Sequence, residues 1–322
     1  MQYVFTLPEY RQSAIVAISS FDGVHRGHQR LLAETITLAR QHGVMPVAIL
    51  PWPPMTDDPE HMGILTTLSE RIALIERFAP GIQVVVLPAD AARPWSPATL
   101  MERITSGWEI KGIMADTSCE QGLYGRELAD MVRRHSALEG TPVYGDESAG
   151  ALGARLRTAI IGGEIAEAAR QLAYEYSLSG EVVGGDRRGR LLGFPTANLR
   201  VDTGKVIPGN GIYAVRVGLP GERSAARPAV ASVGVRPTFG DGNTRLVEVH
   251  LLDLSMDLYG VRLETAFVEW LRPEERFASV EALIHQMTED VQQARQRLAD
   301  PGRIATGSES SLEAVHRDDA HP

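Results

Sequence analysis

The sequence of 322 residues has a single cysteine, Cys119, which excludes an intrachain disulfide and a zinc site built from cysteines. No apolar run approaches the roughly 20 residues needed to span a bilayer. The first residues do not combine a charged region with an apolar core, so no signal peptide is visible. Together these absences predict a cytoplasmic protein that does not associate with a membrane.

Basic residues are fewer than acidic ones. The sequence has 32 lysines and arginines and 41 aspartates and glutamates, which gives a formal net charge of −9. This balance argues against broad nucleic-acid binding, although Arg187, Arg188 and Arg190 could form a local basic patch. The P-loop sequence G-x-x-x-x-G-K-[ST] is missing, since Gly204-Lys205 is followed by Val206. The sequence therefore argues against a P-loop kinase and favours small-molecule partners.

The length is sufficient for two domains of ordinary size. In the first half, short apolar runs typical of buried parallel strands alternate with helical patterns. This alternation predicts a doubly wound, Rossmann-like α/β domain over residues 1–160. The expected strands are 14–19, 47–50 and 84–87, and the expected helices run from about 27 to 43 and over 68–78.

The second half has a different texture, with many short alternating segments separated by Gly, Pro, Asp and Asn. This texture predicts a closed antiparallel β-barrel or a sandwich over residues 179–302, reached through a connecting helix at 161–178. A terminal helix with Ser279 as N-cap is expected, because its apolar residues form one stripe. We expect residues 303–322, which are polar and aperiodic, to be disordered. The expected strands are 179–183, 211–217, 229–235, 246–252 and 262–270, and the stripe comprises Val280, Leu283, Ile284, Met287, Val291, Ala294 and Leu298.

Two histidines, His25 and His28, follow the first predicted strand at the start of its helix. In open α/β sheets ligands bind at that edge, and a helix N-terminus offers free N–H groups to phosphates. The imidazoles could therefore hydrogen-bond a phosphate during nucleotidyl transfer. Two histidines three residues apart could equally form half of a metal site or be solvated.

The hexapeptide 193–198, G-F-P-T-A-N, predicts a sharp turn that leads into an extended segment. Gly193 allows a ligand to approach the backbone closely, and alternation places Thr196 and Asn198 on the same side. Their oxygens suit a hard cation such as Mg²⁺ that also carries nucleotide phosphates. An ordinary Pro-Thr turn with Asn as a local cap is the alternative.

Glu248 lies in a predicted strand in which Val247, Val249 and Leu251 alternate with Glu248 and His250. It is a candidate base for the proton of an attacking hydroxyl. The alternative is a solvent-facing strand glutamate. The catalytic interpretation requires Glu248 to lie near the oxygens of residues 196–198, across the cavity of the barrel.

Residues 21–32, FDGVHRGHQRLL, resemble the H-x-G-H nucleotidyltransferase superfamily and, more narrowly, the N-terminal domain of prokaryotic bifunctional riboflavin kinase/FAD synthetases. Residues 65–71, LTTLSER, also resemble a segment of that domain. The resemblance implies that His25 and His28 bind the phosphates of ATP, with Gly27 making room. It extends to Arg155 and Arg157, the two arginines retained from the family's S-S-T-R-I-R.

The first half departs from that family at four places, each of which removes a polar or aromatic group. Hydrogen-bond donors aimed at a transferring phosphate can each matter by a few kcal/mol. We therefore expect FMN adenylylation to be weak or absent. Ser20 stands where the family usually has Asn, Leu50–Pro54 replaces the histidine-containing F-E-P-H-P, residues 112–119 lack both aromatic residues of G-x-D-F-x-F-G, and residues 153–157 lack the hydroxyls of S-S-T-R-I-R.

From about residue 180 to residue 297 the sequence resembles the riboflavin kinase domain without interruption. The motifs that carry this resemblance are 193–198, GIYA at 211–214, GVRPTF at 234–239, EVHLLD at 248–253, DLYG at 257–260 and LRPE at 271–274.

The resemblance implies a six-stranded barrel that transfers the γ-phosphate of ATP to the 5′-hydroxyl of riboflavin, giving FMN. It implies that Thr196 and Asn198 hold Mg²⁺ and phosphate oxygens and that Glu248 is the base. It also implies that the glycine-rich turn 184–193 covers the nucleotide. The ATP-binding residues would be Gly189, Gly193, Pro195, Thr196 and Asn198, and the flavin-binding residues Arg236 and Thr238.

Several functions compete at this point. Either the kinase alone works and FMN is the product, which we favour, or both domains work and the product is FAD. A non-catalytic flavin- or nucleotide-binding module is a further alternative, although binding alone would not require a base. The H-x-G-H domain could also transfer a nucleotide to another small phosphate.

Overall fold

The structure is a computed structural model of the full chain, which divides into two compact units, residues 1–155 and 156–322. The described residues are 12–52, 63–88, 97–115, 143–145, 149–185, 189, 192–221, 226–236, 244–254 and 256–299.

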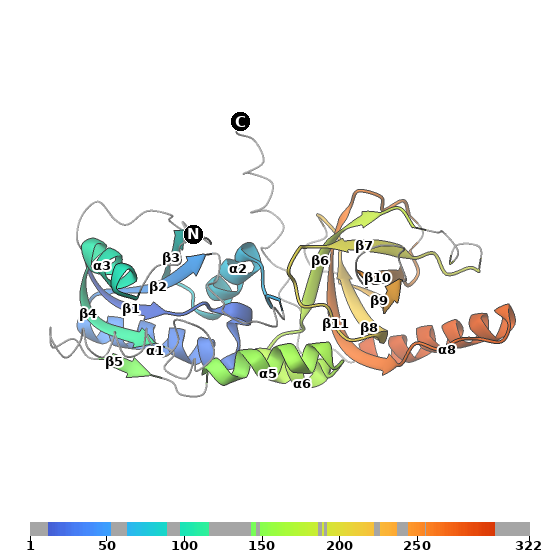
Figure 1. Ribbon diagram of the computed structural model, residues 1–322, viewed down its shortest axis with the longest axis horizontal. Coiled ribbons are helices and arrows are strands. Elements are labelled where there is room, and N and C mark those ends of the chain that lie inside the picture. The colour runs from blue at the N-terminus through green and yellow to red at the C-terminus, as the bar shows by residue number, and fades with distance from the viewer. Residues whose placement is uncertain are drawn as a thin grey trace. The chain divides into compact units, whose positions relative to one another are not determined.

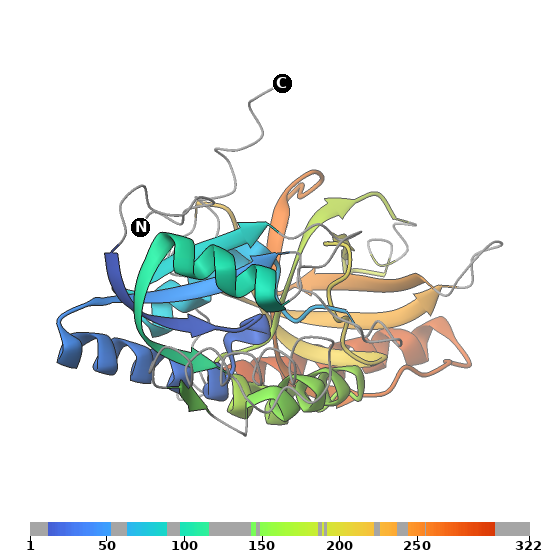
Figure 2. The same ribbon diagram turned by 60° about the vertical axis from the view of Figure 1, so that its left-hand side comes forward.

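The first unit contains a parallel sheet whose strand order is β3-β2-β1-β4-β5. Two helices, α1 and α2, pack on one face and α3 packs on the other, as Figure 2 shows. This arrangement confirms the predicted doubly wound α/β domain. The strands are β1 Gln12–Ile18, β2 Met45–Trp52, β3 Gln83–Pro88, β4 Trp108–Ala115 and β5 Val143–Gly145, and the helices are α1 Arg26–His42, α2 Leu68–Phe78 and α3 Pro97–Gly107.

The central strands of this sheet are apolar on both faces because helices cover both. Ile15 and Ala17 of β1 face α1 and α2, whereas Ala14 and Val16 face α3. Helix α1 ends at Gly43, whose φ of 64° gives the left-handed cap that glycine adopts without strain. This packing fixes the strand-to-helix turn after β1, which carries the two histidines.

In the sequence, α5 Ala149–Ile161 and α6 Ile165–Leu172 come before the first strand of the barrel and are separated by Gly162, Gly163 and Glu164. The end of α5 belongs to the second unit and is bonded within it, because the Gly209 N–H donates to the Ile160 carbonyl at 3.0 Å. Tyr213 caps the same region by donating to the Gly209 carbonyl at 2.6 Å, and burial raises the pKa of Tyr213 to about 12. The predicted domain boundaries, with a separate connecting helix at 161–178, stay a prediction.

The second unit is built around a closed antiparallel barrel of six strands in the order β10-β7-β6-β11-β8-β9 (Figure 1). This confirms the barrel over the sandwich. The strands are β6 Ser177–Val183, β7 Ala197–Val201, β8 Gly211–Gly218, β9 Arg227–Arg236, β10 Thr244–Leu251 and β11 Arg262–Arg272.

The terminal helix α8, Val280–Leu298, packs beside β8, β9 and β11 (Figure 1). Ser279 is its N-cap as predicted, and its hydroxyl accepts from the Ala282 N–H at 3.2 Å. The predicted stripe is only partly covered, since Ala294 and Leu298 are buried whereas Val280 is 54% exposed. The tail predicted at 303–322 lies outside the described residues. Among the helices of the described part, none is long and apolar enough to cross a membrane.

Candidate functional site

A row of side chains crosses four neighbouring strands of the barrel. Asn198 of β7 lies directly opposite Glu248 of β10, and the row continues to Val183 on β6 and Ser232 on β9. Residues directly opposite each other in an antiparallel pair have Cβ atoms about 4.5–5.5 Å apart on the same face. The amide and the carboxylate that the sequence singles out, 50 positions apart, are therefore nearest neighbours.

This row lies on the outer face of the barrel. Val247 and Val249 are fully buried, as the alternation predicts, and they belong with other apolar side chains inside the barrel. Glu248 therefore does not face Asn198 across an internal cavity, as the sequence-based interpretation assumed. The interior is filled with apolar side chains, and the two polar groups meet side by side on adjacent strands. Glu248 is half-buried and Asn198 is 7% exposed.

Glycine backbone covers one end of the row. A methyl group added at Gly185 would collide with the amide of Asn198, so only glycine lets the chain pass this close. At Gly189 an added methyl group would collide with the Phe194 carbonyl and lie 3.3 Å from the Thr196 hydroxyl. The glycine-rich segment thus lies against both predicted metal and phosphate ligands, Thr196 and Asn198.

The turn that presents Thr196 is held at both ends. Gly193 has a φ of 87°, and the Gly189 carbonyl accepts from the Leu192 and Phe194 N–H groups at 3.1 and 2.9 Å. On the other side, His250 Nδ1 lies 2.8 Å from the Pro195 carbonyl, and its ring meets Phe194 edge-on. Because the carbonyl accepts, His250 donates from Nδ1. The sequence identified His250 only as a neighbour of Glu248. Its hydrogen bond to the turn before β7 depends on the pairing of β10 with β7, which no local sequence pattern predicts.

The candidate oxygen ligands at this site are the Thr196 hydroxyl, which lies just before β7, and the Asn198 amide and Glu248 carboxylate of the row. Such hard ligands suit Mg²⁺, which is usually held by few protein groups together with substrate phosphates. Among the described residues, no group of three His, Cys, Asp or Glu side chains could hold a metal by themselves. The arrangement therefore fits a cation shared with a phosphorylated ligand better than a closed protein site.

Of the predicted flavin-binding residues, Arg236 ends strand β9, and its side chain lies outside the described part. Thr238 also lies outside the described residues. Their assignment to the flavin stays a prediction. The same holds for Arg155 and Arg157, which lie on α5, exposed and half-buried respectively, on either side of the division between the two units.

In the first unit the two histidines are close together and buried, with exposures of 1% for His25 and 3% for His28. Their rings stack with centroids 3.8 Å apart and an interplanar angle of 13°. His25 is the N-cap of α1, and its Nδ1 accepts from the His28 N–H at 3.4 Å. Gly27 is buried in the first turn between them. The sequence thus predicted the location of the pair but not its stacking.

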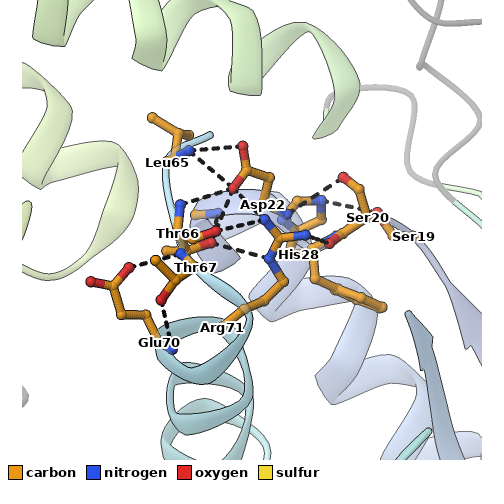
Figure 3. Close-up of polar contacts among 11 residues, drawn as sticks. Ser19, Ser20, Asp22, His28, Leu65, Thr66, Thr67, Glu70 and Arg71 are labelled. Carbon is orange, nitrogen blue, oxygen red and sulfur yellow. Dashed lines mark hydrogen bonds and ion pairs between the residues drawn. The ribbon is translucent and has the colours of Figure 1, made fainter. Parts of the chain in front are cut away.

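Ser19 is a polar neighbour of this pair that the sequence did not single out. Its hydroxyl oxygen lies 3.1 Å from His28 Nε2, as Figure 3 shows, and both residues are buried. The Ser19 hydroxyl oxygen also accepts from the Phe21 N–H at 3.3 Å. A nitrogen atom of the H-x-G-H motif is therefore engaged by the protein itself.

A second buried network holds the turn between β1 and α1. The Asp22 carboxylate accepts from the Leu65 and Thr66 N–H groups and from Arg71 Nη2 at 2.6 Å (Figure 3). Arg71, which is fully buried, also donates to the Ser20 carbonyl at 2.6 Å. Its guanidinium lies 5.1 Å from the centre of the ring of Trp52, which ends β2 and belongs to the altered segment 50–54.

This network supports a strained backbone. Phe21 and Val24 have φ values of 49° and 35°, although side chains disfavour such angles. Residues of this kind persist only where the surroundings fix them, and here the bonds to Asp22 and Ser20 do so. The segment 65–71 that resembles the adenylyltransferase family is therefore the structural partner of the F-D-G turn, a relation that its sequence separation concealed.

Known proteins resemble both halves. The chain matches the FAD synthetase family over residues 7–141 and the riboflavin kinase family over residues 172–298. A bifunctional riboflavin kinase/FMN adenylyltransferase of Listeria monocytogenes is 30% identical, over 87% of this chain and 91% of its own length. The protein of that name from Pseudomonas fluorescens is 34% identical, over 89% of this chain and 94% of its own length.

Among solved structures, one described as a macrolide-efflux protein from Streptococcus pneumoniae superimposes with a TM-score of 0.74 at 25% identity, covering 91% of this chain and 99% of that one. The two-domain fold, the paired barrel residues and these relatives agree with one another. The chain belongs to the bifunctional riboflavin kinase/FMN adenylyltransferase family.

Proposed function

We propose that the barrel phosphorylates riboflavin with ATP to give FMN and ADP. The observation that carries this proposal is the direct pairing of Glu248 with Asn198 on adjacent strands, beneath the glycine backbone at Gly185. Phosphoryl transfer depends mainly on positioning and on neutralising charge. The row supplies a base, polar ligands and a close-fitting backbone cover within one small area.

In the proposed reaction Glu248 accepts the proton of the riboflavin 5′-hydroxyl. The hydroxyl oxygen bonds to the γ-phosphorus, the bond from that phosphorus to the β,γ-bridging oxygen breaks, and ADP leaves. Thr196 and Asn198 orient the phosphate oxygens next to the base. Gly185 and Gly189 keep the covering segment close enough to exclude water from the transferred group.

Mg²⁺ is the cation that this site would use. Thr196 and Asn198 would hold it, and it would neutralise charge on the phosphates of the nucleotide. The support is the hard-oxygen character of the two side chains and the location of Asn198, which is buried beside a carboxylate. Glycine backbone against these ligands leaves room for phosphates where a side chain would not.

We propose in addition that FMN adenylylation by the first unit is weak or absent. The His25–His28 pair is retained, but the family's polar groups are missing at Ser20, in residues 50–54 and in residues 153–157. The contact of Ser19 with His28 Nε2 supports this proposal, because a phosphate would have to replace it. The alternative, a fully bifunctional enzyme that makes FAD, is favoured by the family and by the presence of both domains.

The test is to incubate the purified full chain with riboflavin, ATP and Mg²⁺ and to separate the flavins by chromatography. FMN without FAD is the expected result. FMN followed by FAD would overturn the proposal for the first unit and leave that for the barrel intact. Riboflavin binding without any product would favour the non-catalytic binding module and overturn the proposal for the barrel.

A further inference from the structure

The direction in which riboflavin must lie follows from the order of the strands. The covering glycines lie against Asn198 of β7 and against Thr196 just before it, so the nucleotide belongs on that side of Glu248. Attacking and leaving oxygens lie roughly in line in phosphoryl transfer. The acceptor must therefore approach from the opposite side, which is the outer face of β9.

Two positions of β9 point to this outer face next to Glu248. Ser232 lies directly opposite Glu248, and Gly234 follows two residues later, about 6–7 Å further along the strand. Between them Val233 is fully buried in the interior, which confirms the alternation. A substrate polyol whose terminal hydroxyl lies at Glu248 would thus extend along β9 past Ser232 and Gly234.

The space over Gly234 is occupied by the carboxylate of Glu274. A methyl group added at Gly234 would collide with Glu274 Oε1 and lie 2.9 Å from both Cδ and Oε2. Glu274 belongs to the segment 273–279 between β11 and α8. A second carboxylate therefore reaches the same outer face as Glu248 from a different part of the chain.

The Glu274 carboxylate interacts electrostatically with Arg272, but the hydrogen bonds of that guanidinium go to another carboxylate. Arg272 forms a two-pronged ion pair with Asp290, with Nε–Oδ1 and Nη2–Oδ2 distances of 2.7 Å each. No hydrogen-bond or ion-pair partner of Glu274 occurs among the residues that the structure describes. Partial loss of water raises the pKa of Glu274, and the charge of Arg272 opposes that rise. The residue is exposed, so its carboxylate is accessible to a ligand.

We propose that Glu274 binds the ribityl chain of riboflavin by accepting hydrogen bonds from its secondary hydroxyl groups. This inference rests on the proposed kinase function and extends it to substrate recognition. Glu274 would fix the polyol over β9 and so deliver the 5′-hydroxyl to Glu248. The absence of a side chain at Gly234 is what allows the carboxylate to lie there.

The test compares Glu274→Ala and Glu274→Gln with the matched control Glu275→Gln, which changes the neighbouring exposed glutamate. We expect Glu274→Ala to raise the KM for riboflavin roughly tenfold to a hundredfold, because hydrogen bonds to a charged group are lost. Glu274→Gln should have a smaller effect, because it keeps a neutral acceptor. The KM for ATP should not change, and Glu275→Gln should behave like the unaltered protein.

A second variant, Gly234→Ala, tests the contact between Glu274 and the backbone of β9 by changing the residue beneath the carboxylate. The added methyl group meets the Glu274 carboxylate before any other atom, so it should displace the carboxylate and raise the riboflavin KM. In the double variant Gly234→Ala/Glu274→Ala the two effects should not add. Additive effects would show that Gly234 and Glu274 act separately and would overturn the inference.

Binding of lumiflavin, which carries the ring system without the polyol, separates recognition of the chain from recognition of the ring. Fluorescence titration should show weaker riboflavin binding and unchanged lumiflavin binding for Glu274→Ala. Equal weakening for both ligands, or an unchanged riboflavin KM, would overturn the inference while FMN formation by the unaltered protein still supports the kinase. Absence of FMN formation by the unaltered protein would instead contradict the proposed function itself.

Discussion

The first unit places its motif residues in the turn after a parallel strand, and the second places them within adjacent strands on the outer face of a barrel. In the barrel Asn198 and Glu248 face each other on adjacent strands, and glycine backbone lies against Asn198. In the first unit His25 and His28 stack against each other, and His28 Nε2 contacts the Ser19 hydroxyl. The comparison teaches that retention of a motif and retention of an open polar site are separate properties.

The forces that hold the two sites differ as well. The turn of the first unit depends on a buried ion pair, Asp22–Arg71, whose members are 5% and 0% exposed. The turn of the barrel depends on glycines and on the tether from His250 to the Pro195 carbonyl. We therefore expect substitutions in the first unit to act mainly on stability and those in the barrel to act mainly on turnover.

The largest effect is expected for Arg71→Leu. Removing one member of a buried pair leaves a buried charge without its partner, which typically costs about 3–5 kcal/mol. Urea unfolding followed by circular dichroism should show the first unit unfolding at lower denaturant, while FMN formation in buffer stays near its original rate. Arg77→Leu, on the exposed side of the same helix, is the control. Equal losses for the two variants would contradict the role of the buried pair.

The next effect is expected for Asn198→Ala. We expect turnover of riboflavin to FMN to fall at least roughly a hundredfold, because the side chain orients the phosphate and its cation next to the base. The barrel should stay folded, as judged by its thermal transition. Arg200→Ala, two residues along on the same face and exposed, provides the control. A fall of the same size in both variants would mean that the whole strand, rather than Asn198, is responsible.

A smaller effect is expected for His250→Ala. The bond from Nδ1 to the Pro195 carbonyl is worth about 1 kcal/mol, so the KM for ATP should rise by roughly three- to tenfold. The riboflavin KM should change less, because His250 holds the nucleotide side of the row. Steady-state kinetics with each substrate varied in turn would measure both values. A rise confined to the riboflavin KM would contradict this division of the site.

The sequence predicted β1, β2, β3, α1 and α2 of the first unit and most strands of the barrel, because apolar periodicity and turn residues are local signals. It gave no range for β4, β5, α3 or α5. The alternation around Glu248 predicted its face, and Ser279 was found as a cap from its position before an apolar stripe. The extent of burial of that stripe was not predictable. Val280 in the first turn of α8 is exposed, whereas Ala294 and Leu298 near its end pack with Ala214 and Val268 of the barrel.

The contacts within the sites were less predictable, because they join segments that are distant in the sequence. The register that pairs Glu248 with Asn198 depends on the closure of six strands, and the assumed location across a cavity was wrong. Asp22 and Arg71 are 49 residues apart, so no local pattern links them. Glu274 belongs to a motif that resembles the family, yet only the fold brings it over Gly234.

The most direct test of the account is the rate of FMN formation by Glu248→Gln beside that of Glu181→Gln. Both glutamates lie on the outer face of the barrel, but Glu181 pairs with Arg200 and lies outside the row. Glutamine keeps the shape of Glu248 and cannot accept the proton, so we predict a loss of at least roughly a hundredfold for Glu248→Gln alone. A fully active and folded Glu248→Gln would remove this carboxylate from the mechanism and contradict the account.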